Sequence, residues 1–271
     1  MKKINSLATQ RPLVFGLVVA FVYIVMLVVS ALLGNLWPGE ETYGQPGGII
    51  GRVISIIILL VVLSRLGWLR TAGFTRLGPW QIWLICLLAL VYSIAGSAYA
   101  LTGNIDFSFS NLTLSGFITL FILTAAFMEQ VAFRGLILHG FVRAWGSTNR
   151  GLIKSALISS LFFSGLHILD LASGRPLSNV LLQSVETFFL GVFFAALVLS
   201  GRSIYPAAFF HALFNLSAYL SGKGLEPAPL TFLFLSLLIL PLALYGLYLL
   251  RDLARLPGHS DSPLRAEHPT Q

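Results

Sequence analysis

"TAAFMEQVAFRG", residues 124–135, places Glu129, Gln130 and Arg134 inside a stretch whose other side chains suit hydrocarbon. An ionisable side chain deep in a bilayer costs at least ~2.5 to 3.5 kcal/mol, so its presence there is by default a functional signal. The stretch belongs to a longer apolar run, residues 112–141. Whether that run lies in a membrane decides how these three residues are interpreted.

The composition favours a membrane protein. Of the 271 residues, 56% are hydrophobic and 10% are charged, whereas an ordinary soluble domain has roughly 25% charged residues. The single cysteine, Cys86, excludes an intrachain disulfide and a thiol-rich metal site. The net charge of +7 does not indicate nucleic-acid binding, because the basic residues lie at the ends of apolar runs and form no stripe.

Apolar runs of about the length that crosses a bilayer as a helix occur eight times. They cover residues 12–34, 49–69, 80–101, 112–141, 152–170, 178–200, 203–221 and 228–250. The connections between them are rich in Gly, Pro, Ser and Asn, as turns are. We therefore expect an all-α integral membrane protein, a bundle of about eight transmembrane helices. Residues 12–250 would form one membrane domain between tails at 1–11 and 251–271.

The charges of the connections alternate along the chain. One set of connections and tails carries 13 basic residues: Lys2, Lys3, Arg11, Arg65, Arg70, Arg76, Arg143, Arg150, Lys154, Arg202, Arg251, Arg255 and Arg265. The opposite connections carry only Arg175 and Lys223, together with acidic residues. Since basic loops stay on the cytoplasmic side, this pattern predicts a multi-pass cell-membrane protein with both termini in the cytoplasm.

A few ionisable residues lie well inside the predicted helices: Glu129, Arg134, His167, Glu186 and His211. Facing lipid, each would be costly, so we expect them to face one another or a polar cavity open toward the cytoplasm. Two positions leave two interpretations open. Arg134 either reaches out to the headgroups or serves the site, and Glu186 either lines the cavity or pairs with a buried donor.

Helical spacing groups the polar residues further. His211 and Asn215 are four residues apart and therefore project from one face, as do Phe163 and His167. Gln130 and Arg134 also share a face, whereas Glu129 points about 100° away from Gln130. A carboxylate, two imidazoles and a carboxamide from three helices can carry out hydrolytic chemistry.

Three motifs carry a family resemblance: "EQVAFR" at 129–134, "FSGLH" at 163–167 and "HALFN" at 211–215. In this order they resemble the Glu-Glu-x-x-x-Arg, Phe-x-x-x-His and His-x-x-x-Asn pattern of the CAAX-protease and bacteriocin-processing (CPBP) intramembrane proteases. These are related to the type II CAAX prenyl endopeptidases. The resemblance covers residues from about 112 to 221. It implies an eight-helix membrane bundle with a cavity that reaches the cytoplasmic side.

The resemblance also implies roles for the site residues. Glu129 and His167 would activate the attacking water, and His211 and Asn215 would stabilise the oxyanion. Gln130, Arg134 and Phe163 would support them. The substrate would be a membrane-bound or lipidated peptide in contact with membrane lipid, such as a prenylated CAAX tail, a peptide pheromone or a bacteriocin leader.

One position departs from the family pattern, since Gln130 stands where the family has its second Glu. We expect its carboxamide to hydrogen-bond the Arg134 guanidinium in place of an ion pair. Alternatives from other classes are a non-catalytic bacteriocin-immunity or interaction protein on the same scaffold, a small transporter, and a purely structural polar network.

The sequence allows two predictions about a metal ion, a zinc site or a site without metal. Glu129, His167 and His211 could supply a three-ligand zinc site with an open fourth position. The His-Glu-x-x-His helix of metalloproteases is absent, however, and a glutamate-activated water needs no ion, so we expect a glutamic-type protease without a cofactor. The Gly-x-Ser-Gly motif of rhomboid-like serine proteases and the paired aspartates of the presenilin type are also absent.

Overall fold

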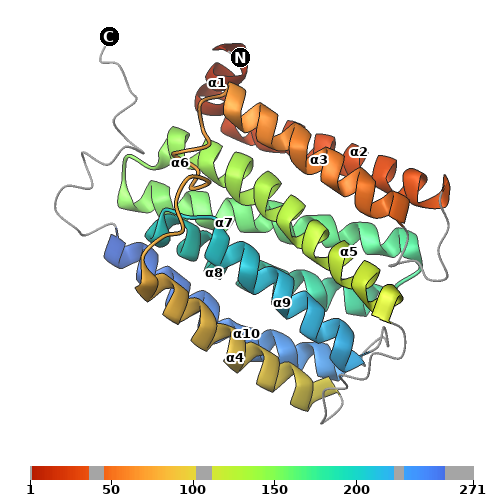
Figure 1. Ribbon diagram of the computed structural model, residues 1–271. Helices are drawn as coiled ribbons and strands as arrows, with labels where there is room; N and C mark the ends of the chain where they lie inside the picture. Colours follow the sequence, from red (N-terminus) through yellow and green to blue (C-terminus); the bar gives the residue numbers. More distant parts are fainter. Residues whose placement is uncertain (1, 37–45, 102–111, 223–228, 254–271) are drawn as a thin grey trace.

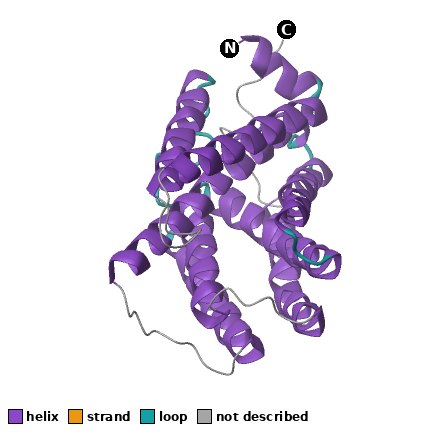
Figure 2. Cartoon of the chain, turned by 90° about the vertical axis from the view of Figure 1, so that its right-hand side faces the viewer, coloured by secondary structure: helices purple, strands orange, loops and turns teal. Residues whose placement is uncertain are grey.

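The computed structural model describes residues 2–36, 46–101, 112–222 and 229–253, and every regular element in these ranges is a helix. The order is α1 (Lys2–Gln10), α2 (Pro12–Leu36), α3 (Pro46–Arg65), α4 (Trp80–Leu101), α5 (Leu112–Gln130), η1 (Val131–Leu138), α6 (His139–Trp145), α7 (Asn149–Gly165), η2 (Leu166–Ser173), α8 (Leu177–Gly201), α9 (Tyr205–Gly222) and α10 (Pro229–Leu253). The all-helical prediction is confirmed for this part of the chain (Figure 2).

Five helical stretches are long and apolar enough to cross a membrane: Pro12–Leu36, Pro46–Arg65, Gly116–Trp145, Asn149–Ser173 and Leu177–Gly201. Trp80–Ala95 is apolar but shorter. Each of the eight predicted runs overlaps a helix of the structure. The protein is therefore a multi-pass membrane protein, while the count of eight crossings stays a prediction.

The long helices lie side by side along one direction of the molecule (Figure 1). Helix α8 packs along both α7 and α10, α2 packs along α3, and α9 packs against α4 and α5. Many side chains on the outer faces of these helices are large, apolar and exposed, for example Phe21, Leu88 and Val91. Exposed apolar surface on this scale is what a lipid-facing bundle needs.

Two clusters of buried apolar side chains fill the interior. One gathers residues of α4, α8, α9 and α10, and the other gathers residues of α1, α2, α3 and η1. Helix α7 contributes to both, with Ala156 in the first cluster and Phe163 in the second. The polar residues described below lie along this border.

The connections rich in arginine meet at one end of the bundle. The backbone N–H of Ile204 donates to the carbonyl of Gly73 (3.2 Å), and the Tyr205 hydroxyl donates to the carbonyl of Phe74 (2.8 Å). The segment 66–79 is thereby fixed to the segment 202–205. This clustering agrees with the alternating charges of the sequence, and the side of the membrane that this end faces stays a prediction.

Helices α2 and α3 approach so closely that only glycine fits between them. A Cβ atom on Gly47 would lie 2.0 Å from the carbonyl oxygen of Leu33, and one on Gly51 would lie 2.7 Å from Cα of Ser30. Both of these neighbours are backbone atoms that cannot rotate away. Close backbone approach through small residues is a standard way to pack helices in membranes.

We therefore expect Gly51→Ala to destabilise the protein, since overpacking costs about 1–3 kcal/mol. The measurement is the thermal unfolding midpoint of the purified chain in detergent. Gly116→Ala is the matched control, because a Cβ atom there would meet nothing within 4 Å. Equal midpoints for the two variants would show that the α2–α3 contact is not as tight as described.

Candidate active site

The ring of Phe163, near the end of α7, lies at the centre of the polar cluster. It is 2% exposed. Its centroid lies 5.6 Å from the ring of His167 and 5.7 Å from the ring of His211, edge to face in both cases. The guanidinium carbon of Arg134 lies 5.2 Å from the same centroid. Phe163 therefore contacts side chains from η1, η2 and α9.

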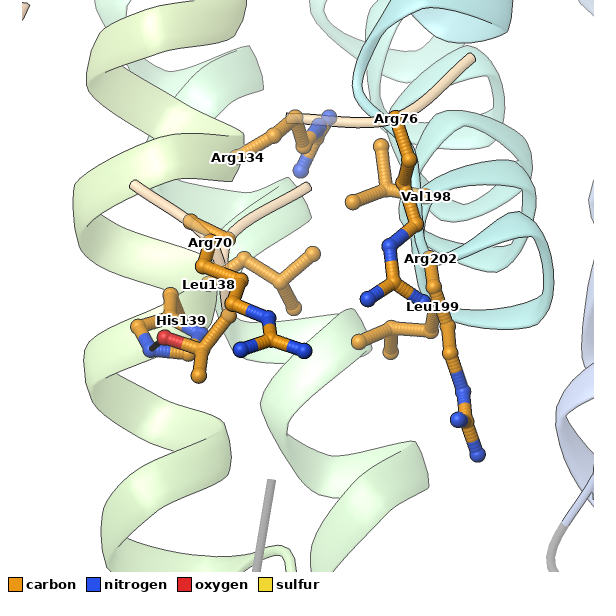
Figure 3. A pocket seen from close by; sticks show the side chains of 10 residues that line it. Arg70, Arg76, Arg134, Leu138, His139, Val198, Leu199 and Arg202 are labelled. Atoms are coloured by element: carbon orange, nitrogen blue, oxygen red, sulfur yellow. Dashed lines mark hydrogen bonds between the residues drawn. The ribbon is translucent and has the colours of Figure 1, made fainter. Parts of the chain in front are cut away.

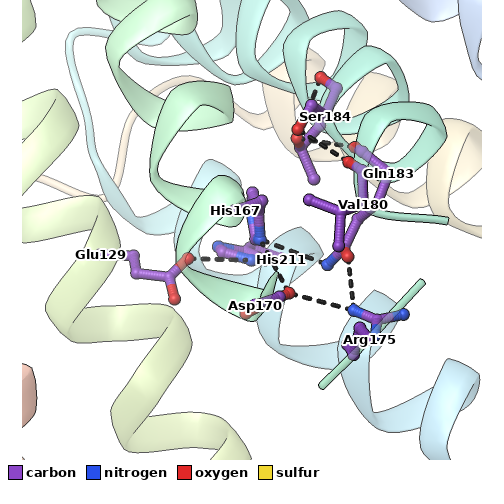
Figure 4. Close-up of polar contacts among 9 residues, drawn as sticks. Glu129, His167, Asp170, Arg175, Val180, Gln183, Ser184 and His211 are labelled. Atoms are coloured by element: carbon purple, nitrogen blue, oxygen red, sulfur yellow. Dashed lines mark hydrogen bonds and ion pairs between the residues drawn. The ribbon is translucent and has the colours of Figure 1, made fainter. Parts of the chain in front are cut away.

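Glu129 and His211 meet across two helices. The Oε2 atom of Glu129, at the end of α5, lies 3.6 Å from Nε2 of His211 on α9 (Figure 4). This is within ion-pair range but longer than a hydrogen bond. The Glu129 side chain is 21% exposed and the His211 side chain is 6% exposed. The carboxyl group thus faces the imidazole from the more open side.

Gln130 is directed at His211 as well. Its Nε2 atom lies 3.1 Å from Nδ1 of His211, in a contact between two buried side chains. An amide nitrogen can only donate, so Nδ1 is the acceptor and the neutral ring carries its proton on Nε2. That N–H then points toward the side on which Glu129 lies. Gln130 fixes the tautomer and the orientation of His211.

The expected hydrogen bond between Gln130 and Arg134 is wrong. The carboxamide oxygen Oε1 of Gln130 has no hydrogen-bond partner among the described residues, and its nitrogen is directed at His211. The physical reason is that residues 131–138 form a π-helix, not an α-helix. Its wider turn, with i→i+5 hydrogen bonds, changes which side chains share a face and rotates Arg134 toward Glu129.

Arg134 lies inside the bundle. Its side chain is buried, with 1% exposed, and its Nη1 atom donates to the hydroxyl of Ser159 on α7 (3.2 Å). It interacts electrostatically with Glu129. Of the two interpretations that the sequence left open, the structure therefore favours a position inside the bundle, next to the site.

His167 is held by the amide of Gln183 on α8. The Nε2 atom of Gln183 lies 3.2 Å from Nδ1 of His167, and Oδ2 of Asp170 lies 3.9 Å from the same atom (Figure 4). Nη1 of Arg175 donates to the carboxamide oxygen of Gln183 and to Asp170 (3.0 Å). Because a guanidinium can only donate, Arg175 fixes the amide orientation, and Nδ1 of His167 accepts from Gln183.

The remaining predicted residues lie beside this cluster. Glu186 is buried on α8, with 7% exposed, and interacts electrostatically with His167. Asn215 is half-buried on α9, one turn beyond His211. His167 and Glu129 also interact electrostatically. The structure thus brings Glu129, His167 and His211 to one place, with Asn215 one helical turn away.

Four neighbours of the cluster went unnoticed in the sequence. Tyr23 and Arg52, on α2 and α3, interact with Glu129. Gln183 donates to His167, and Asp170, which accepts from Arg175, lies 3.9 Å from the same ring nitrogen. Arg52 could have been found, because it lies inside the apolar run 49–69, where an ionisable residue is itself a signal. The uncharged Tyr23 and Gln183 carry no such signal.

The metal alternative needs three ligands around one point. Among the residues that the structure describes, no three or more His, Cys, Asp or Glu side chains are grouped so as to hold an ion. Nδ1 of both histidines is directed at an amide nitrogen, which leaves Nε2 of each ring for other partners. The absence of a cofactor stays a prediction.

Comparisons with known proteins agree with the motifs. Residues 111–217 match the family model described as type II CAAX prenyl endopeptidase Rce1-like. The match contains all three motifs and thus every residue of the cluster from Glu129 to Asn215. Neither a curated protein nor a solved structure matches the chain at a significant level. The family prediction is confirmed: through residues 111–217, this chain is related to the CAAX proteases of the type II prenyl endopeptidase family.

Proposed function

We propose that the protein is an intramembrane endopeptidase that hydrolyses a peptide bond of a membrane-associated or lipidated peptide. The observation that carries the proposal is the 3.6 Å contact between Glu129 and His211, beside His167. A carboxylate and two imidazoles from three different helices are costly to bury together in a membrane. Structural contacts between helices are made more simply with Ser or Thr.

Glu129 is the general base in this proposal. It takes a proton from a water molecule as the water oxygen attacks the peptide carbonyl carbon. The same carboxyl group then delivers the proton to the amide nitrogen as the carbon–nitrogen bond breaks. His167 orients the water through the N–H of its Nε2 atom, because Gln183 occupies its Nδ1 atom.

His211 and Asn215 stabilise the negative charge that develops on the carbonyl oxygen. Because Gln130 donates to Nδ1, His211 carries its proton on Nε2, and the 3.6 Å distance from Nε2 to Glu129 is longer than a hydrogen bond. Asn215 offers a carboxamide N–H₂ one turn along the same helix. Donors of this kind contribute about 2.7 to 4 kcal/mol each in comparable sites. No step of this scheme requires a metal ion.

Two observations support the substrate class: the family match, and the partial exposure of the site residues. The side chains of Glu129 and His167 are 21% and 22% exposed, so each is partly accessible from outside the bundle. The CAAX-type family match favours a lipid-modified peptide that is already in the bilayer. We place this access on the cytoplasmic side of the cell membrane, together with both termini, on the positive-inside rule.

Glu129→Gln keeps the size of the side chain but removes the base, so we expect hydrolysis to be lost while folding is kept. The measurement compares the membrane peptidomes of cells that produce the wild-type chain and cells that produce the variant. Peptides that depend on the wild-type chain should disappear with Glu129→Gln.

Asp252→Asn, at an exposed position of α10, is the matched control and should leave the peptidome unchanged. If the Glu129→Gln and wild-type peptidomes are the same, the chain is not a glutamate-dependent protease. An immunity protein that acts by binding would give that result.

Gln130→Met removes the donor to His211 but keeps the side-chain volume. We expect His211 to populate both tautomers, and catalytic turnover to fall about tenfold or more because the oxyanion donor is no longer fixed. Nitrogen-15 spectra of labelled histidine report the tautomer directly. Gln81→Met, at an exposed position of α4, should change neither quantity. An unchanged His211 tautomer in Gln130→Met would exclude this positioning role.

A further inference from the structure

A pocket of about 210 Å³ opens at the end of the bundle where the arginine-rich connections meet. It lies between the segment 66–79, η1, α6 and the end of α8. Four arginines line it: Arg70, Arg76, Arg134 and Arg202. The other lining residues are His139 and a set of apolar and uncharged side chains, and none of them is acidic. The walls therefore bring together four positive charges with no acidic side chain among them, while Glu129, which interacts electrostatically with Arg134, is not a lining residue.

The arginines come from both sides of the pocket. Figure 3 shows the guanidinium groups of Arg70 and Arg76 on opposite sides of it, with Arg134 at one end. The segments that carry Arg76 and Arg202 are hydrogen-bonded to each other at Gly73 and Ile204, which fixes the backbone from which these two side chains extend. The like charges would repel one another if nothing bound between them.

Arg134 supplies independent evidence for a ligand. It is 1% exposed, and its Nε and Nη2 atoms have no hydrogen-bond partner among the described residues. A buried guanidinium with unused donors is costly unless an anion completes its hydrogen bonds. Its Nη1 atom is already used by Ser159, so Nε and Nη2 are the two donors of this lining residue that remain without a hydrogen bond.

The backbone conformation of Arg202 is unusual. It has φ of 48°, the only positive φ of a non-glycine residue among the described parts of the chain. A side chain in this left-handed region costs of order 1 kcal/mol or more, and such strain gathers at functional sites. A glycine would adopt this conformation without cost, so an arginine here suggests that its charge is useful.

We propose that this pocket binds a phosphate group, either the phosphate of an anionic lipid headgroup or free phosphate. Arginine forks match phosphate oxygens in pairs of hydrogen bonds. Leu77 and Trp80, exposed at 67% and 68%, lie next to Arg76 and mark the level of the membrane interface. Basic pockets between transmembrane helices at that level suit lipid phosphates. This site goes beyond the proteolytic function and does not depend on it.

The test uses the purified full-length chain in neutral detergent. One arm adds inorganic phosphate at constant ionic strength, and the other adds phosphatidylglycerol or, for comparison, phosphatidylcholine to the micelles. Binding is read from the shift of the thermal unfolding midpoint and from lipid retained in native mass spectrometry. The variant replaces Arg70, Arg76 and Arg202 by Gln, and its affinity should be at least about tenfold weaker, since a charge-assisted hydrogen bond is worth that much.

The matched control replaces three exposed arginines outside the pocket, Arg11, Arg150 and Arg251, by Gln, so the net charge changes equally. Arg76→Gln alone is the second variant in case the triple variant does not fold. Selective loss of phosphatidylglycerol binding identifies a lipid site, and selective loss of phosphate binding identifies a free-phosphate site. Equal binding by pocket and control variants, or no binding by the wild-type chain, overturns the proposal.

Discussion

The packing of Phe163 is the constraint on which the geometry of the cluster depends. Its buried ring contacts the imidazoles of His167 and His211 edge to face, and the Arg134 guanidinium lies over it. These residues come from three elements, η1, η2 and α9. Each edge-to-face contact is worth about 0.5–1.5 kcal/mol beyond its buried area, enough to choose one ring orientation over another. Helix α7 also contributes to both apolar clusters. The Phe163 ring therefore contacts the apolar interior of the bundle and the two histidine rings of the site at the same time.

Two elements at the site depart from α-helical geometry, although Glu129 and His211 themselves lie on α-helices. Arg134 lies on the π-helix η1, directly after Glu129 and Gln130, and His167 lies on the 3₁₀-helix η2, directly after α7. Both kinds of helix have poorer hydrogen-bond geometry than an α-helix and tend to appear at functional sites. Here the amide of Gln130 is used on His211, and Nη1 of Arg134 donates to Ser159. The amides of Gln130 and Gln183 then hold the two histidines in the same way, through Nδ1, so that neither amide occupies Nε2, and Nε2 of His211 lies 3.6 Å from Glu129.

Much of this architecture could be predicted because its signals are local. Apolar runs of membrane-spanning length predicted where helices occur, and a carboxylate and two histidines inside those runs predicted where polar residues must meet. The contact between Gln130 and His211 could not be predicted. The grouping of side chains on one helix face assumed α-helical spacing, and no sequence feature of residues 131–138 indicates a π-helix. The contact between Gln183 and His167 could not be predicted either, since the sequence does not indicate which partner an uncharged amide in a helix binds. Arg52 did carry a signal, but its proximity to Glu129 depends on how α3 packs against α5.

The central claim is that Glu129 on α5 and His211 on α9 act on each other inside the bundle. A double-mutant cycle measures this directly, without knowledge of the substrate. The free energy of unfolding in detergent is determined for the wild-type chain, for Glu129→Gln, for His211→Gln and for the double variant. The account predicts a coupling of about 0.5–3 kcal/mol, as for residues in contact. Additive effects, with no coupling beyond experimental error, would contradict it.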